Sequence, residues 1–253
     1  MYPTDLTDSQ WQVIERLLDD KRKRKYPLRD VFDALFYLNK TGCQWRRLPK
    51  DYPPFRIVHY YFRKWSQGGL FQGLNQALNR LYREKVGRKP SPSLGLLDAQ
   101  SVKKSEWGLP NKGFDGYKHI KGMKRQVVVD TLGLILAVLV HPANEYDGNA
   151  ARSVLETLAR QGYERLEKIL ADQGYRGQLG SWMIEFLAWT LEIVAGAKGI
   201  HTTFKVVPQR WKVERTISWL QGQRRLVKDY EAETDSSEAY VYLFNIKRVV
   251  SKI

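Results

Sequence analysis

The spacing of apolar residues changes close to residue 90, and this change limits the folds that the chain can adopt. Before it, apolar side chains recur at the three- and four-residue spacing of amphipathic helices. After it, short apolar runs of strand length alternate with helical segments. The stretch 87–93 between them is rich in Gly, Pro and Ser, as linkers are. We therefore predict a helical domain over residues 1–87, a linker over 88–93 and an α/β domain over 94–253.

The helical domain carries start and stop signals for four helices. Thr7 and Gln10 have capping-box spacing at the start of the first helix. The second is expected to begin near Leu28 and to stop at Gly42. A Pro-Pro pair and a Gly-Gly pair bound the third, and regularly spaced leucines indicate a fourth.

The third helix is a candidate DNA-recognition element. One side carries the cations Arg56, Arg63 and Lys64, and the other carries apolar and aromatic residues. In a helix-turn-helix-like unit, such a helix would enter the major groove of DNA. The alternative is that its aromatic residues build a small core. Both interpretations can hold together, because opposite faces of the helix do the two jobs.

The α/β domain is expected to contain several short strands. The strand-like runs are 94–97, 126–130, 134–141, 168–171 and 204–207, and the second and third read as a hairpin joined at 131–133. Helical spacing returns from Arg210, and a last helix is expected near 236–250. No internal repeat or low-complexity tract interrupts this pattern.

The charge balance points to a polyanionic partner. The 253 residues include 42 Lys and Arg against 27 Asp and Glu, which gives a net charge of +15. Such an excess repels itself, and nucleic acid relieves the repulsion while releasing counterions. No apolar run is long enough to span a bilayer, so we expect no membrane partner. The single cysteine, Cys43, fits a reducing cytoplasm.

Three acidic residues could form a metal site. Asp98 and Asp172 each follow a short apolar run, and Glu214 lies early in the helix after the last expected strand. Strand ends of an open α/β sheet are common positions for functional sites. Three neighbouring carboxylates repel one another and stay ionised only around a cation. Their hard oxygen atoms suit Mg²⁺ or Mn²⁺, and two such ions can promote phosphodiester exchange.

Structural roles for the same aspartates stay open on spacing alone. Asp98 could cap a helix, and Asp172 could form a turn before Gln173 and Gly174. Asp130 also ends an apolar run, yet it reads better as part of the hairpin turn.

Several segments, in order along nearly the whole chain, resemble DDE transposases. They are LDAQSVK from Leu97, GYKHIKG from Gly116, VDTLG from Val129, ADQGY from Ala171 and RWKVERT from Arg210. The N-terminal LTDSQW and GCQWR segments, from Leu6 and Gly42, resemble the same proteins. The nearest resemblance is to the group of insertion sequence five, within the insertion-sequence-four superfamily.

The resemblance implies an RNase H-like mixed sheet with flanking helices, preceded by a small all-helical domain. It places Asp98 on the first strand, Asp172 at the end of the fourth strand and Glu214 on the following helix, as catalytic residues and metal ligands. It implies a transposase that binds the terminal inverted repeats of a mobile element. Metal-dependent cleavage and strand transfer into target DNA follow, with two Mg²⁺ (or Mn²⁺) ions. Because two DNA ends must be handled, a homodimer or larger assembly on double-stranded DNA is expected, at the nucleoid in the cytoplasm.

The segment around Glu214 departs from the family pattern at two positions. Arg210 and Glu214 match, but Val207 stands where the family has Tyr and Gln221 where it has a cation. Gln221 lies about two helical turns after Glu214 and so on its face. Arg224 or Arg225 could supply the missing charge, or the change could mark a weakened copy.

Basic residues around these motifs are expected to contact DNA phosphates. In the α/β domain they are Lys118, His119, Lys121, Lys124, Arg125, Arg210, Arg215, Arg224 and Arg225. For the first five, an ordinary solvated loop is the alternative. Trp211 and Trp219, which flank Glu214, fit a core better than a base-stacking platform.

Three other functions are compatible with these features. A catalytically decayed or repurposed copy would bind DNA without cutting it. A plain RNase H-like nuclease would cleave without preference for element ends. A general polyanion-binding module would lose affinity steeply with salt at every sequence.

Overall fold

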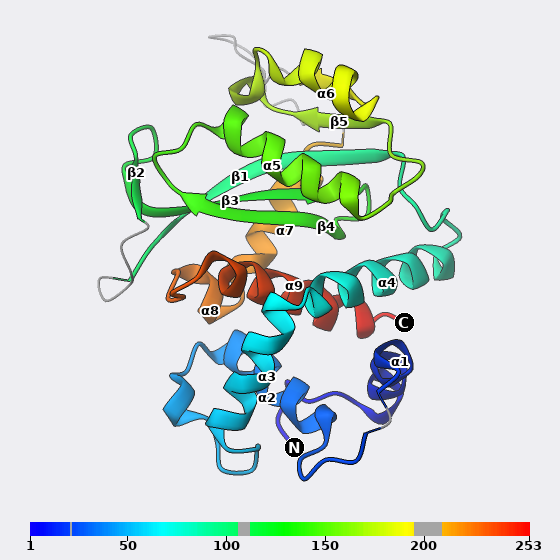
Figure 1. The fold of residues 1–253 in the computed structure, drawn as a ribbon, viewed down its shortest axis with the longest axis vertical. Helices are drawn as coiled ribbons and strands as arrows, with labels where there is room; N and C mark the ends of the chain where they lie inside the picture. Colours follow the sequence, from blue (N-terminus) through cyan, green and yellow to red (C-terminus); the bar gives the residue numbers. More distant parts are fainter. Residues whose placement is uncertain (21, 106–111, 195–208) are drawn as a thin grey trace. The chain divides into compact units, whose positions relative to one another are not determined.

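The computed structural model describes residues 1–20, 22–105, 112–194 and 209–253. They form two compact units, drawn together in Figure 1. The first unit contains Met1–Arg88 and Leu220–Ile253, and the second contains Lys89–Trp219. The expected strand at 204–207, together with Val207, lies outside the described residues.

The first unit is all-helical, as predicted for the N-terminal region. Its elements are α1 (Asp8–Leu18), α2 (Leu28–Thr41), the 3-10 turn η1 (Trp45–Arg47), α3 (Phe55–Gln67), α4 (Leu70–Lys85), α8 (Arg224–Val227) and α9 (Thr234–Val250). The capping box at Thr7 is present, with Gln10 donating its backbone N–H to the threonine hydroxyl. Gly42 ends α2 in the left-handed conformation, at φ 66°. The predicted start of α1 after Thr7 and the predicted end of α2 at Gly42 are therefore both present.

The C-terminal helix α9 packs within this helical unit, which differs from the expected domain spanning 94–253. It contacts α4, α2 and α3, and most of its length is buried. In the interior, the Asn245 side-chain amide donates to the side-chain oxygens of Asn75 at 2.6 Å and Asn79 at 3.0 Å. Apolar spacing predicts that such a segment is a helix, but it does not say which part of the chain the helix packs against.

The second unit is built on one mixed sheet. Its strands are β1 (Leu94–Lys103), β2 (Gly113–Asp115), β3 (Ile120–Val129), β4 (Ile135–Pro142), β5 (Lys168–Ala171) and β6 (Thr190–Ile193). β1, β3 and β4 form an antiparallel meander, and β5 and β6 extend it in parallel on the other side of β1. The short β2 pairs with the beginning of β3. This arrangement confirms the predicted RNase H-like mixed sheet.

The predicted hairpin is the β3–β4 pair. The Asp130 carboxylate accepts hydrogen bonds from the backbone N–H groups of Leu132 at 2.8 Å and Leu134 at 2.9 Å. Gly133 adopts φ 76°, which the turn requires. Asp130 is therefore a turn residue, as its sequence context indicates.

Helices flank the sheet. They are α5 (Asp147–Arg160), the 3-10 turn η2 (Gln173–Tyr175), α6 (Leu179–Leu187) and α7 (Trp211–Gln221). Figure 1 shows α5 in front of the sheet, where Val154, Leu155 and Leu158 join one buried core with the strands. α7 is tied to the hairpin turn, because the Thr216 hydroxyl donates to the Gly133 carbonyl at 3.1 Å. No helix within the described ranges combines the length and apolar character needed to cross a lipid bilayer.

The strand β1 is longer than expected, and this changes the setting of Asp98. The apolar run stops at Leu97, but pairing with β3 continues to Lys103. Asp98 therefore lies inside a strand and does not cap a helix. The polar residues after it hide this continuation, since strand prediction depends on apolar patterning.

A buried carboxylate gives the first unit a pH-sensitive feature. Asp33 on α2 is 6% exposed and accepts a hydrogen bond from the Leu6 backbone N–H at 2.7 Å. Burial raises the pKa of Asp33 to about 6 from an ordinary 3.8, although the Leu6 bond opposes the shift. Because the folded state keeps its proton to higher pH, this group favours folding less as pH rises from 3.8 towards 6.

The change Asp33→Asn should remove this pH dependence while keeping an oxygen acceptor for Leu6. We expect the unfolding free energy of the variant, relative to the native chain, to rise by about 2–3 kcal/mol between pH 4 and pH 7. Urea titrations at both pH values measure it. Asp8→Asn removes an exposed carboxylate from the same unit and is the control. A difference that does not change with pH would contradict the assigned role of Asp33.

Candidate active site

The parallel register of β1 and β5 brings Asp98 and Asp172 together. Leu94 pairs with Lys168 and Leu96 with Leu170. Two residues beyond this last pair, β1 continues with Asp98, whereas β5 has ended and Asp172 begins the turn η2. Asp98 and Asp172 therefore lie side by side, at the edge of the sheet where β5 ends. Asp172 also accepts a hydrogen bond from the Gly174 backbone N–H at 2.8 Å, so its predicted turn role is present beside any catalytic one.

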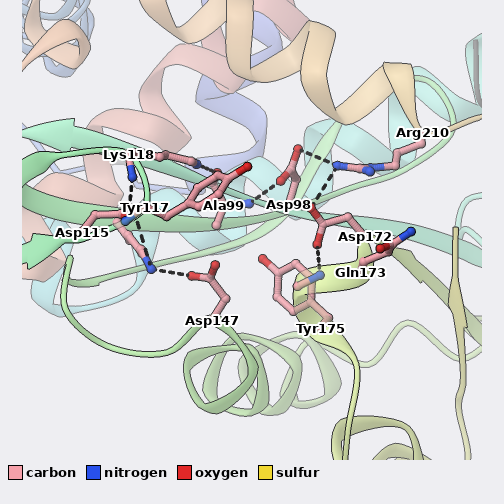
Figure 2. Close-up of a pocket in the computed structure, with 12 residues that line it drawn as sticks. Asp98, Ala99, Asp115, Tyr117, Lys118, Asp147, Asp172, Gln173, Tyr175 and Arg210 are labelled. Carbon is pink, nitrogen blue, oxygen red and sulfur yellow. Dashed lines mark hydrogen bonds and ion pairs between the residues drawn. The ribbon is translucent and has the colours of Figure 1, made fainter. Parts of the chain in front are cut away.

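The third acidic residue reaches the same place from α7. Glu214 lies in the first turn of α7, and Arg210 lies four residues earlier, just before the helix. One nitrogen of Arg210, Nη2, is 3.8 Å from Asp98 Oδ2, 3.4 Å from Asp172 Oδ2 and 3.7 Å from Glu214 Oε1. Figure 2 shows this guanidinium facing the two aspartates. The three predicted carboxylates therefore surround a single positive group.

The electrostatics of Asp98 reflect its position inside the sheet. Burial raises the pKa of Asp98 to about 6, and the neighbouring Asp172 adds to this rise. A hydrogen bond from the Ala99 backbone N–H, at 2.8 Å, and the charge of Arg210 both oppose it. A cation placed beside the Asp98 carboxylate therefore favours its ionised form.

The three carboxylates are ligands of the kind that divalent metal ions bind. Three carboxylate oxygens from separate elements match the hard ligands that Mg²⁺ and Mn²⁺ prefer. The guanidinium of Arg210 acts as a stand-in cation at their centre. Among the residues that the structure describes, no three acidic, His or Cys side chains lie close enough to hold a metal ion directly.

Asp98, Asp172 and Arg210 line a pocket of about 470 Å³. Its other charged residues include two aspartates, Asp115 and Asp147, that the sequence analysis did not single out. Lys124 bridges them, with its Nζ 3.9 Å from Asp115 and 3.0 Å from Asp147. Burial opposes ionisation of Asp115, but hydrogen bonds from Ser101 and from backbone N–H groups outweigh it and lower its pKa. Neither aspartate follows an apolar run of strand length, so the sequence pattern carried no signal for them.

A buried tyrosine anchors the turn that presents Asp172. Tyr175 is 1% exposed, and its hydroxyl donates to Gln126 Oε1 on β3 at 2.5 Å. The Gln126 amide nitrogen in turn donates to Asp147 at 3.2 Å. This chain of hydrogen bonds links the Asp172 turn to the centre of the sheet and to α5.

The predicted basic cluster divides into exposed and buried members. Lys118, His119 and Lys121 are exposed, and Lys118 lines the pocket with its Nζ 3.1 Å from the Ala99 carbonyl oxygen. Lys124 also lines the pocket, where it pairs with Asp115 and Asp147. Arg125 is 1% exposed, because its side chain points into the sheet core beside Gln100, so it is not at a surface that DNA can reach.

The arginines near the end of the chain also differ in setting. Arg215 on α7 is stacked between Trp211 and Trp219, at 4.5 and 4.6 Å from their ring centroids. Arg224 is exposed. Arg225 is buried, and its Nη2 is 2.6 Å from Glu231, so it has a structural role in the helical unit.

The cations predicted on the third helix lie along the exposed side of α3. Arg56 and Lys64 are exposed, Arg63 is half-buried, and all three line a shallow depression with His59. Val58, Phe62 and Trp65 fill the core on the other side. The amphipathic arrangement is as expected.

Two protein families match the chain. The family described as transposase DDE domain matches residues 89–243, and the family described as putative transposase of IS4/5 family matches residues 6–75. The chain belongs to the DDE transposases. The predicted family and enzyme class are thereby confirmed, and the matched DDE segment contains Asp98, Asp172 and Glu214.

Solved structures of another transposase show a remote likeness. The Mos1 strand transfer complex is 13% identical, with a TM-score of 0.33, covering 96% of this chain and 81% of that chain. The Mos1 mariner paired end complex with Mn is 11% identical, with a TM-score of 0.32, covering 96% and 83%. No curated protein sequence matches this transposase.

The change Tyr175→Phe should loosen the Asp172 turn of this transposase. It leaves the Gln126 oxygen in the interior without its donor, which costs about 1–2 kcal/mol. Chemical unfolding measures the loss. Tyr146→Phe is the matched control, because the Tyr146 hydroxyl bonds the Gly174 carbonyl on the same turn but the residue is 57% exposed. Equal losses in the two variants would show that the buried bond does not anchor the turn.

Proposed function

We propose that this transposase binds the terminal inverted repeats of a mobile element and catalyses metal-dependent DNA cleavage and strand transfer. The observation that carries the proposal is the convergence of Asp98, Asp172 and Glu214 on the guanidinium of Arg210. Two of these carboxylates, Asp98 and Asp172, also line a charged pocket. Cut-and-paste transposition needs both hydrolysis at the element ends and attack of the freed 3′-hydroxyls on target DNA.

The metal site would be built from three directions. Asp98 on β1, Asp172 after β5 and Glu214 on α7 would hold Mg²⁺ (or Mn²⁺), with two ions as the expected number. When bound, such ions activate a water or 3′-hydroxyl and stabilise the leaving oxygen of a phosphodiester. Asp98 lies within β1 and Asp172 directly follows β5, so sheet pairing positions their backbone, whereas Glu214 is 58% exposed.

Nearby cations would position the DNA strand. Lys118 lies on the pocket wall beside the Ala99 carbonyl, and Lys121 and His119 are exposed on the same segment. A phosphate held by Lys118 would lie at the wall of the pocket that Asp98 and Asp172 line. Arg125 and Arg225 are outside this proposed surface because they are buried.

Recognition of the terminal repeats would fall to the helical unit. The exposed side of α3 presents Arg56, Arg63 and Lys64 beside His59, and its other side is fixed in the core. A helix held in this way suits insertion into the major groove. Two ends must be processed, so we expect a homodimer or larger assembly on double-stranded DNA, acting at the nucleoid in the cytoplasm.

A DNA-binding protein without catalytic activity is the second candidate. It is favoured by Gln221, the last residue of α7, which stands where the family has a cation. Arg225 does not replace that cation, since it is buried against Glu231. Phosphate contact by Gln221 is weaker than by Lys or Arg, because the amide carries no charge.

The cleavage assay separates these functions. A labelled duplex carrying a terminal repeat is incubated with Mg²⁺ and either the native chain or Asp172→Asn, which keeps the shape of the side chain. We expect native protein to nick the repeat end and to form joined products, and the variant to lose at least about a hundredfold in rate. Asp130→Asn, at the hairpin turn, is the control for loss of an unrelated carboxylate. Binding without nicking by the native chain would support the non-catalytic candidate, and cutting without end preference would support a plain nuclease.

Salt dependence tests the α3 surface separately. Arg56→Gln should lower affinity for DNA and reduce the slope of log affinity against log salt by about one, because one phosphate contact is lost. Fluorescence anisotropy on a repeat duplex between low and moderate salt measures it. Arg16→Gln removes an exposed cation from α1 of the same unit and should leave the slope unchanged. Identical slopes for native and Arg56→Gln would exclude Arg56 from the interface.

A further inference from the structure

Arg210 occupies the centre of the candidate metal site. Its Nη2 lies within 4 Å of one oxygen from each of the three carboxylates, at 3.4 to 3.8 Å. Its Nε is buried and has no hydrogen-bond partner among the described residues. The side chain is 15% exposed, so it is enclosed by the site and does not extend into solvent.

This position conflicts with a metal ion at the same carboxylates. Mg²⁺ requires oxygen ligands at about 2.0–2.1 Å in a nearly ideal octahedron. The carboxylates now stand around a guanidinium, at distances that suit an ion pair. A metal ion bound by the same oxygens would lie close to the guanidinium, because Arg210 Nη2 is within 4 Å of each of them. A metal ion beside it would also meet the repulsion of two positive charges at short range.

The carboxylates nevertheless need a positive charge when no metal is bound. Three negative groups at one place destabilise each other, and the Asp98 side chain is only 18% exposed. Arg210 counters this repulsion, because its positive charge lies within 4 Å of an oxygen from each carboxylate. It therefore keeps the site assembled in the metal-free chain.

We propose that Arg210 is an internal counter-cation that holds the three carboxylates in place without metal and competes with the divalent metal for them. The proposal rests on the proposed function, which supplies the metal ligands. Arg210 is a positioning residue in this role: it prepares the site and must move aside as the site is loaded. Native metal affinity is therefore lower than the three carboxylates alone would provide.

Metal titration of the full chain tests the competition. Mn²⁺ binding is measured by calorimetry at constant ionic strength and neutral pH for the native chain, Arg210→Gln and Arg215→Gln. Arg215 is the matched control, because it lies on α7 and is stacked between two indoles. We expect Arg210→Gln to bind Mn²⁺ about tenfold more tightly than the native chain, and Arg215→Gln to bind within about twofold of it.

The unfolding temperature of each variant is a second measurement of the same effect. Without metal, Arg210→Gln should unfold at a lower temperature than native, because the carboxylates lose their counter-charge. Saturating Mn²⁺ should raise its unfolding temperature by more than it raises the native value. Arg210→Lys keeps a positive charge in the site, so it should fold without metal and bind Mn²⁺ more weakly than Arg210→Gln. This second variant decides the matter if Arg210→Gln does not fold: Mn²⁺ affinity of Arg210→Lys far below native would show that Arg210 supports the metal.

The outcomes separate this inference from the proposed function. If Asp172→Asn binds Mn²⁺ as tightly as the native chain, the metal site itself is wrong. If Mn²⁺ binding depends on Asp172 but Arg210→Gln binds Mn²⁺ no more tightly than the native chain, the competition is refuted. Arg210 then stays beside the bound metal ion.

Discussion

The parallel pairing of β1 with β5 places Asp98 and Asp172 side by side, and the site depends on this register. Leu94 faces Lys168, and each aspartate comes four residues later along its own segment. A shift of one residue would turn one of the side chains to the opposite face. The core residues of α5 pack on the same strands and hold the register, so the packing of the sheet also fixes the spacing of the acidic groups.

Much of this arrangement can be read from the sequence, and the missing part has identifiable causes. The short apolar run before Asp172 marks a real strand, and the turn at Asp130 forms the expected hairpin. Asp98 is different: its strand continues through polar residues, because β3 supplies the pairing that apolar patterning does not reveal. The packing of α9 with the N-terminal helices joins segments that are far apart in the sequence, and helical spacing does not predict such contacts.

The basic residues show the limit of reading charge from sequence. Arg56 and Lys118 lie where a phosphate can reach them, whereas Arg125 and Arg225 are buried. Arg210 is neither a surface contact nor a core residue, since it lies among three carboxylates whose mutual repulsion it reduces. Sequence spacing predicts only its pairing with Glu214, four residues later on the chain. The two aspartates come from other elements, so its central position depends on the tertiary fold.

Asp98, Asp172 and Glu214 are proposed here as the ligands of one divalent metal site. Crystals grown with Mn²⁺ and measured at its absorption edge test this most directly, because anomalous density locates the ion independently of any assay. We expect density within coordination distance of Asp98 and Asp172, with Glu214 turned towards it and the Arg210 guanidinium withdrawn. Strong density elsewhere in the chain, with Arg210 still between the carboxylates at saturating Mn²⁺, would contradict it.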